Sequence, residues 1–169
     1  MESKTDGNLR LGFRDESETY MRYHAFARRA EDDGIKNVAR LFRAVAEAET
    51  VHALNHMDAL GEVGKTTENL RKAVEEEEGD LFTLYPEFIK QARREDRTEA
   101  VMSMTWIQQS EKAHFELFRQ ALNRLEQGAR DIEEESYFLC TNCGFVAVGV
   151  APFSCPICRA PQKMFREVT

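Results

Sequence analysis

Four helix-length segments of this 169-residue chain each place a glutamate on an otherwise apolar stripe, and in two of them a histidine follows three residues later. The apolar residues recur at alternating steps of three and four, which predicts amphipathic helices whose stripes face a common core. An unpaired carboxylate in such a core is strongly unfavourable, so inward glutamates require cations beside them. The six inward polar residues are Glu16, Glu49, His52, Glu77, Glu111 and His114.

The spacing of these glutamates indicates an internal repeat of one helical hairpin. The separation in sequence from Glu16 to Glu49 nearly equals the separation from Glu77 to Glu111. Residues three apart project from one face of a helix, so each Glu-x-x-His pair offers two neighbouring ligands. Two lone glutamates together with two such pairs form the known signature of ferritin-like di-iron or di-manganese bundles. We therefore predict a dinuclear metal site inside an all-α four-helix bundle.

The expected helices are separated by glycines and polar segments. They cover about residues 9–33, 35–60, 67–93 and 98–128, with breaks at Gly34, at Gly61 and near residues 94–97;. In the run T-T-E-N-L a threonine is expected to cap the third helix. Pro86 is expected to kink that helix rather than end it.

The join between the second and third helices restricts the topology. In a ferritin-like bundle these two helices run parallel. If Glu49 and Glu77 lie at the same height in the bundle, the end of the second helix and the start of the third are about 30 Å apart, and the connection must span this distance. Its roughly six residues span about 20 Å at most. Either the bundle runs plainly up and down, or the last two helices pack onto the first two of a second subunit. We favour the helix-exchanged homodimer.

All four cysteines lie near the C-terminus, as C-T-N-C and C-P-I-C with eleven residues between the pairs. In a reducing cytosol this spacing indicates a metal site rather than disulfides, with zinc or iron as the metal. Beside a redox-active metal bundle we favour iron, since a one-electron carrier has a use there. The predicted ligands are Cys140, Cys143, Cys155 and Cys158.

Three regions are therefore expected: a ferritin-like domain over residues 1–130, a polar linker over 131–136, and a small β-rich four-cysteine domain over 137–169. The last is too short to fold on a hydrophobic core alone, so its metal contributes much of its folding free energy.

Composition excludes two classes of partner. The chain has 23 basic and 30 acidic residues, intermixed, which argues against nucleic-acid binding;. The N-terminus lacks the apolar segment of a signal peptide, and no apolar run approaches membrane-spanning length;. We expect a soluble cytoplasmic protein that contacts no membrane.

The motifs and their order resemble those of the rubrerythrin family. The similarity rests on E-S-E-T-Y-M-R-Y-H-A-F-A in the first helix, T-E-N-L and L-Y-P-E-F in the third, both Glu-x-x-His pairs, and the tail C-T-N-C-G-F followed by A-P-F-S-C-P-I-C-R-A-P-Q-K-M-F. The resemblance implies a ferritin-like di-iron domain joined to a rubredoxin-like domain that holds one further iron. It also implies that the six Glu and His residues bind the di-iron pair and the four cysteines bind the single iron.

This chain departs from the family pattern at three places. Where the family commonly has a glutamate that exchanges with a histidine on one iron, this chain has Asp80, which is one methylene shorter. We include Asp80 among the predicted metal ligands, directly or through water, with solvated surface as the alternative. The connection between the second and third helices is short, and Arg159 stands where a glycine is typical.

By resemblance, the function is reduction of hydrogen peroxide to water in oxidative stress defence, with electrons from NAD(P)H delivered by rubredoxin-type and oxidoreductase partner proteins. The Glu and His ligands would then form the catalytic site. The main alternative is an iron-binding or ferroxidase relative of ferritin whose tail is a structural zinc ribbon. A third is a di-manganese catalase-like enzyme.

Overall fold

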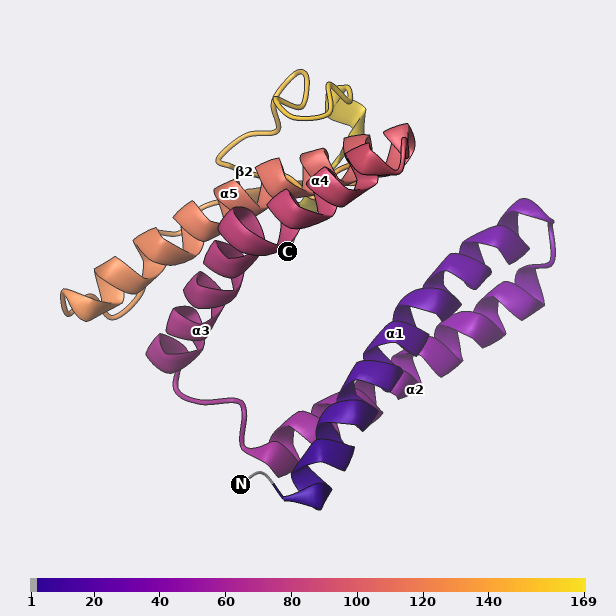
Figure 1. The fold of residues 1–169 in the computed structure, drawn as a ribbon, viewed down its shortest axis with the longest axis horizontal. Helices are drawn as coiled ribbons and strands as arrows, with labels where there is room; N and C mark the ends of the chain where they lie inside the picture. Colours follow the sequence, from indigo (N-terminus) through magenta and orange to yellow (C-terminus); the bar gives the residue numbers. More distant parts are fainter. Residues whose placement is uncertain (1–2) are drawn as a thin grey trace. The chain divides into compact units, whose positions relative to one another are not determined.

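The computed structural model describes residues 3–169 as mostly helical, with a small antiparallel sheet near the C-terminus (Figure 1). This confirms the expected class of helices followed by a β-rich segment. The chain divides into two compact units, Met1–Gly64 and Lys65–Thr169. Among the described helices, none is both long enough and apolar enough to cross a membrane.

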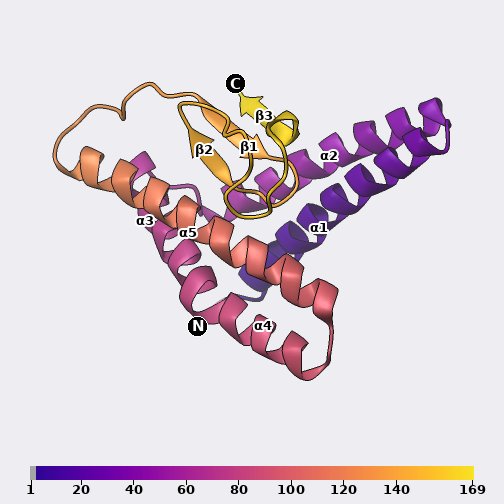
Figure 2. The same cartoon turned by 90° about the horizontal axis from the view of Figure 1, so that it is seen from above.

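The first unit is a hairpin of two long helices, α1 (Lys4–Asp32) and α2 (Lys36–Leu60), which lie side by side (Figure 2). Ser3 caps α1: its hydroxyl accepts a hydrogen bond from the Asp6 N–H, and the Asp6 carboxylate accepts one from the Ser3 N–H;. This reciprocal cap explains why α1 begins before its apolar stripe does. Gly34 turns the chain with φ of +76°, a conformation that favours glycine;. Small side chains let the helices approach closely, and the buried ones are Ala27, Ala30, Ala39, Ala46 and Ala53.

The helical part of the second unit is a pair of packed segments. The first runs without interruption through α3 (Thr66–Gly79), a π-helical turn η1 (Asp80–Leu84) and α4 (Tyr85–Arg94). It packs along α5 (Thr98–Glu126) over its whole length. The four predicted helical regions are therefore present, and the third continues through the π turn.

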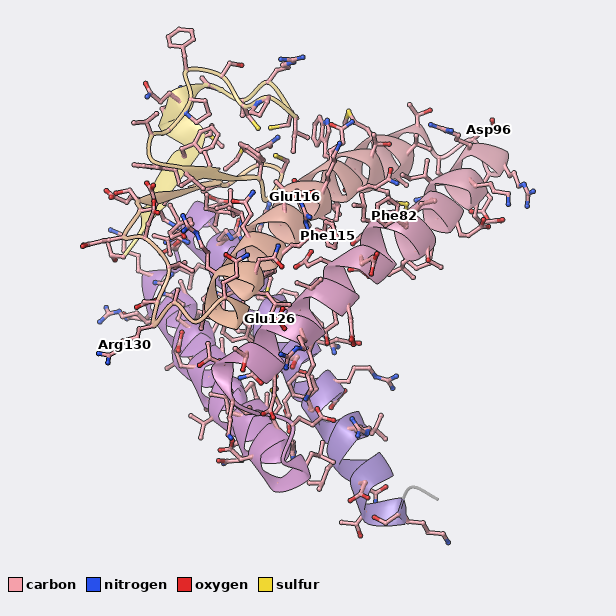
Figure 3. The ribbon with its side chains drawn as sticks, turned by 90° about the vertical axis from the view of Figure 1, so that its left-hand side faces the viewer. Phe82, Asp96, Phe115, Glu116, Glu126 and Arg130 are labelled. Carbon is pink, nitrogen blue, oxygen red and sulfur yellow. The ribbon has the colours of Figure 1, made fainter. Side chains whose placement is uncertain are left out.

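Contacts at its start and near its middle hold the segment from α3 to α4 in place. The expected threonine cap was wrong, because Lys65 is the N-cap of α3 and its N–H donates to the Glu68 carboxylate at 2.7 Å. The Glu68 carboxylate, one turn into the helix, thus satisfies the N–H of the N-cap residue, whereas a threonine cap would have accepted from an N–H of the first turn;. Farther along, Phe82 of η1 meets Phe115 of α5 edge to face, with ring centroids 6.4 Å apart (Figure 3);.

The π turn has a local cause in Pro86. In η1 the Tyr85 N–H donates to the Asp80 carbonyl, five residues back, instead of to Leu81. Proline has no N–H and its ring crowds the preceding turn, and the wider π spacing accommodates both defects. The Leu81 carbonyl freed in this way accepts a hydrogen bond from Gln108 Nε2 of α5 at 3.1 Å. The helix therefore continues past the proline, as the sequence predicts.

The C-terminal tail is a three-stranded antiparallel sheet in the order β2-β1-β3. The strands are β1 (Tyr137–Cys140), β2 (Val146–Val148) and β3 (Phe165–Val168), and a short 3₁₀ turn, η2 (Gln162–Met164), precedes β3. Cys140 ends β1, so the sheet delivers the first cysteine directly into the core of the tail, which consists of the cysteines themselves. The boundaries expected for the domains and the linker stay predictions.

Candidate metal centres

The first group of candidate ligands lies within the α1–α2 hairpin. Glu16 comes from α1, and Glu49 and His52 come from α2; one ligand atom of each lies within 4.8 Å of the others. His52 Nδ1 is 2.9 Å from Glu49 Oε2 and 4.0 Å from Glu16 Oε1. A hydrogen bond shared with Glu49, followed by burial and charge repulsion, raises the pKa of Glu16. The two carboxyl groups therefore compete for a proton that a cation would replace.

The second group repeats this arrangement within the second unit. Glu77 of α3 meets Glu111 and His114 of α5, again with ligand atoms within 4.8 Å of one another. His114 Nδ1 is 2.9 Å from Glu111 Oε2 and 3.7 Å from Glu77 Oε2. Burial raises the pKa of Glu77 to about 8, with further contributions from a hydrogen bond and repulsion from Glu111. Glu77 Oε2 is buried and has no hydrogen-bond partner among the described residues.

All six Glu and His residues predicted from the sequence thus fall into two matching groups, three in each compact unit. Together they offer four carboxylates and two imidazoles, and four negative charges balance two divalent cations. Oxygen and imidazole nitrogen donors of this kind suit iron and manganese. The orphaned Glu77 oxygen is the atom that a cation would satisfy, so the donors of the second group fit a metal ion, and the first group repeats the same donor set;.

Asp80 occupies a different position. It is the first residue of η1, one turn beyond Glu77, and its carboxylate is not part of the group that Glu77, Glu111 and His114 form. Burial and the negative charge of Glu111 raise the pKa of Asp80, so its carboxyl group interacts electrostatically with one residue of this group. A role for Asp80 as a metal ligand stays a prediction.

The four cysteines converge on one point at the edge of the sheet. All four are free thiols, and the paired sulfurs Cys140–Cys158 and Cys143–Cys155 are 3.7 Å and 3.6 Å apart. A metal bound at about 2.3 Å to four tetrahedral thiolates requires sulfur separations of about 3.8 Å. The observed spacing therefore fits one tetrahedral metal ion.

Two similar loops carry these cysteines. In each loop the residue after the second cysteine has positive φ: Gly144 at +84° and Arg159 at +63°. The Gly144 N–H donates to the Cys140 carbonyl, and the Arg159 N–H donates to the Cys155 carbonyl. Arg159 thus adopts the conformation of the glycine it replaces, at a steric cost that glycine does not have. We call the Cys140–Cys143 loop the first knuckle and the Cys155–Cys158 loop the second knuckle.

The environments of the thiols differ. Burial raises the pKa of Cys140 and of Cys143. Burial also acts to raise the pKa of Cys158, but hydrogen bonds from the Asn142 side chain and the Ala160 backbone outweigh it, and the pKa falls to about 7. The lowered pKa makes Cys158 more readily converted than Cys140 or Cys143 to the thiolate that binds metal;.

The first knuckle packs against α5 beside the second ligand group. Ser110 Oγ, which is buried, lies 2.9 Å from the Cys143 carbonyl, and His114 Nε2 donates to the Gly144 carbonyl at 3.0 Å. With its Nε2 as donor, the neutral imidazole of His114 presents the Nδ1 lone pair toward Glu111. One histidine therefore contacts both candidate centres. Ser110 was missed from the sequence, because nothing in the helical pattern shows that the tail docks there.

The chain is similar to known proteins both in sequence and in structure. The family model described as rubrerythrin matches residues 7–122, and the rubredoxin-like domain of rubrerythrin matches residues 138–166. Rubrerythrin-2 of Clostridium acetobutylicum is 30% identical, over 94% of this chain and 93% of that protein. Rubrerythrin of Porphyromonas gingivalis is 33% identical, over 98% of this chain and 90% of that protein. A solved structure, the partially reduced state of nigerythrin, has a TM-score of 0.57 and 27% identity, covering 99% of this chain and 88% of that one.

Proposed function

The chain belongs to the rubrerythrin family, and from this membership we propose that it is a non-haem di-iron peroxidase that reduces hydrogen peroxide to water in oxidative stress defence. The observation that carries the proposal is His114, which lies against Glu111 through Nδ1 and against the backbone of the four-cysteine loop through Nε2. Iron bound by the two Glu and His groups would supply the electrons that cleave the peroxide O–O bond. The alternative of an iron-storing protein gives this histidine contact no role.

The chain's own residues would hold and protect this chemistry. The Gly144 carbonyl keeps the His114 ring in one tautomer and one orientation, which is how backbone acceptors fix metal-binding histidines. Glu77 Oε2 is buried, so solvent does not reach this oxygen. Burial and the charges of Glu111 and Asp80 raise the pKa of Tyr85, so its phenol stays protonated near the site.

We further propose that the four-cysteine centre returns electrons through the first knuckle. The covalent path from the Cys143 sulfur reaches the Gly144 carbonyl, and a single hydrogen bond of 3.0 Å leads from there to His114. The second unit of each chain would thus connect its own tail to its own half of the dinuclear site. The electrons would come ultimately from NAD(P)H through partner proteins in the cytoplasm.

The complete dinuclear site, in our proposal, joins the Glu16 group of one chain to the Glu77 group of a second chain. Glu49 lies well before the end of α2, and Glu77 lies equally far beyond the start of α3. If the two helices run parallel with these glutamates level, the end of α2 and the start of α3 are about 33 Å apart. The five linking residues reach about 20 Å. A parallel ferritin-like bundle therefore needs the helices of a partner.

Exposed apolar side chains support this exchange. Val45 lies one turn before Glu49 on the stripe predicted to face the core, and it is 37% exposed. Phe118 lies one turn after His114 and is 36% exposed. Apolar faces of this kind are unfavourable in water and are typical of surfaces that a further helix pair covers.

Rapid re-oxidation of the reduced, iron-loaded protein tests the peroxidase proposal. Peroxide should restore the colour of the ferric thiolate centre much faster than oxygen does. Glu111→Ala should abolish this response and leave the iron–thiolate absorption intact, because the tail keeps all four cysteines. A tail filled with zinc, with equal responses to peroxide and oxygen, would instead favour iron storage with a structural zinc ribbon.

Mixing two inactive variants tests the exchange separately. Glu49→Ala disables the first ligand group, and Glu111→Ala disables the second. In an exchanged heterodimer one site combines the two intact groups, so co-expression should restore about a quarter of the wild-type di-iron content by random pairing. The control is each variant expressed alone, which should have no intact site. Without any recovery in the mixture, the exchange is wrong and the peroxidase proposal still stands.

A further inference from the structure

The four-cysteine site has a covered side and an open side. Cys140, Cys143 and Cys155 are buried, whereas Cys158 is only partly so. The carbonyls of the first knuckle contact side chains of α5, as described above. The second knuckle, with Cys158, forms no hydrogen bond to α5 within the described part of the chain. If electrons leave through the first knuckle, the second knuckle is where they can enter.

An exposed apolar and basic surface surrounds this second knuckle. We define the knuckle patch as Phe153, Pro156, Arg159 and Lys163, all of which are exposed. Phe153 is 88% exposed, an extreme value for a phenylalanine;. The Gln162 N–H donates to the Phe153 carbonyl at 2.9 Å, which holds the segments before and after the knuckle side by side. The patch residues therefore come from the second knuckle and from two segments that are paired beside it.

The charge of this surface is opposite to that of the chain. Residues 137–169 contain three basic residues and one acidic residue, Glu167, although the whole chain has a net charge of −7. Within residues 3–169, Arg159, Lys163 and Arg166 form no ion pair, whereas several arginines of the helices do. The acidic residues 133–135 lie at the far end of β1, where the Gly149 N–H donates to the Ser136 carbonyl.

We propose that the knuckle patch docks a small acidic electron-carrier protein whose redox centre has an apolar rim. Phe153 and Pro156 contact that rim, and Arg159 and Lys163 attract the acidic surface around it. In the docked pair the carrier loses one electron and the ferric four-cysteine centre becomes ferrous, with no bond or proton changing place. The inference rests on the proposed electron-transfer role of the tail.

Stopped-flow reduction by a purified acidic rubredoxin tests this docking. At low salt, Arg159→Glu and Lys163→Glu should each slow reduction of the ferric centre by about 10-fold, and the difference should shrink as salt screens the charges. Phe153→Ser should slow reduction at every salt concentration. Arg130→Glu is the matched control, because Arg130 is exposed shortly after the end of α5 and is not part of the patch (Figure 3). Dithionite, which needs no docking, should reduce all variants equally.

A binding measurement separates docking from redox activity. With zinc in the four-cysteine site, titration calorimetry with the same rubredoxin should give weaker binding for Arg159→Glu than for Arg130→Glu. Equal binding and equal reduction rates for all variants would overturn the proposal. A change in oligomeric mass for the patch variants would also overturn it, since the patch would then be a subunit contact. Loss of the peroxide response with these docking effects preserved would refute only the peroxidase.

Discussion

At the scale of single residues, Ser110 and His114 connect α5 to the four-cysteine tail. They lie four residues apart on one face of α5, and each contacts a backbone carbonyl of the first knuckle. Ser110 Oγ also lies 3.0 Å from the Trp106 carbonyl, so its single proton serves one acceptor at a time;. A buried hydroxyl of this kind fixes the tail on the helix through geometry rather than through apolar area.

Removing that hydroxyl should loosen the tail. Ser110→Ala leaves a buried carbonyl unsatisfied, which costs about 1–3 kcal/mol. Trp106, the only tryptophan, packs against the cysteine cluster and reports on the contact. We expect its fluorescence to become more accessible to acrylamide in Ser110→Ala but not in Ser103→Ala, which changes an exposed serine of the same helix. Equal quenching in both variants would contradict the docking role of Ser110.

Glu77 should make the metal-free protein less stable at high pH. Burial raises its pKa from 4.5 to about 8, so the folded state binds a proton that the unfolded carboxyl has already lost. The stability due to this proton is fully present below pH 4.5 and is lost as the pH rises through about 8;. Glu77→Gln should therefore flatten the fall in melting temperature across this window. Glu78→Gln, at an exposed position, should keep the wild-type slope.

At the scale of elements, the π turn in the α3–α4 segment lies between the site and the far end of the helix. It begins at Asp80, directly after the turn that carries Glu77. Because the Tyr85 N–H bonds to Asp80, the Leu81 carbonyl is free to contact α5. The π turn thus gives the α3–α4 segment a polar anchor on α5, four residues after Glu77.

Gln108 is the partner that makes this turn tolerable. Gln108→Leu should leave the Leu81 carbonyl without a partner and lower the free energy of unfolding by about 1–3 kcal/mol. Thermal or urea denaturation of the zinc-loaded or iron-loaded protein measures the change. The neighbouring Gln109 is exposed, so Gln109→Leu is the control and should alter stability little;. If the two variants have the same stability, the hydrogen bond from Gln108 to the Leu81 carbonyl does not stabilise the fold.

At the scale of the whole molecule, each compact unit holds three of the six predicted Glu and His ligands, and the tail has a candidate metal site of its own. The core of the tail is its cysteines, with aromatic side chains packed around them. Apolar packing therefore stabilises the helices, whereas metal–thiolate bonds stabilise the tail.

Removing the tail metal should unfold the tail alone. A structural zinc ion contributes on the order of 10 kcal/mol to folding of such small domains. The double variant Cys140→Ser, Cys155→Ser should become protease-sensitive after about residue 136 and keep its helical circular dichroism at 222 nm. A parallel loss of helical signal would show that the helices depend on the tail. Untreated, metal-loaded wild type provides the protected reference.

Much of the helical fold was predictable because its signals are local and periodic. The apolar stripes, Gly34 and Gly128 mark the helices within about five residues, and the caps at Ser3 and Lys65 were missed. The N-cap of α3 was predicted incorrectly because the Glu68 carboxylate accepts a hydrogen bond from the backbone N–H of the N-cap residue. Almost any residue can supply this N–H, so the side chain at the N-cap gives no signal in the sequence. The π turn was expected only as a kink, since proline predicts a defect but not how neighbouring carbonyls are satisfied.

The sequence by itself identified the candidate donor residues and determined which helix face each one occupies. The helical period brings Glu49 with His52, and Glu111 with His114, onto one face, and cysteine spacing identifies the tail site. Only the tertiary structure decided that the first knuckle rests on α5, where Ser110 and His114 hold its carbonyls. The reason is physical: a periodic pattern fixes which face a residue occupies, whereas a hydrogen bond across 30 residues depends on how two separate segments pack.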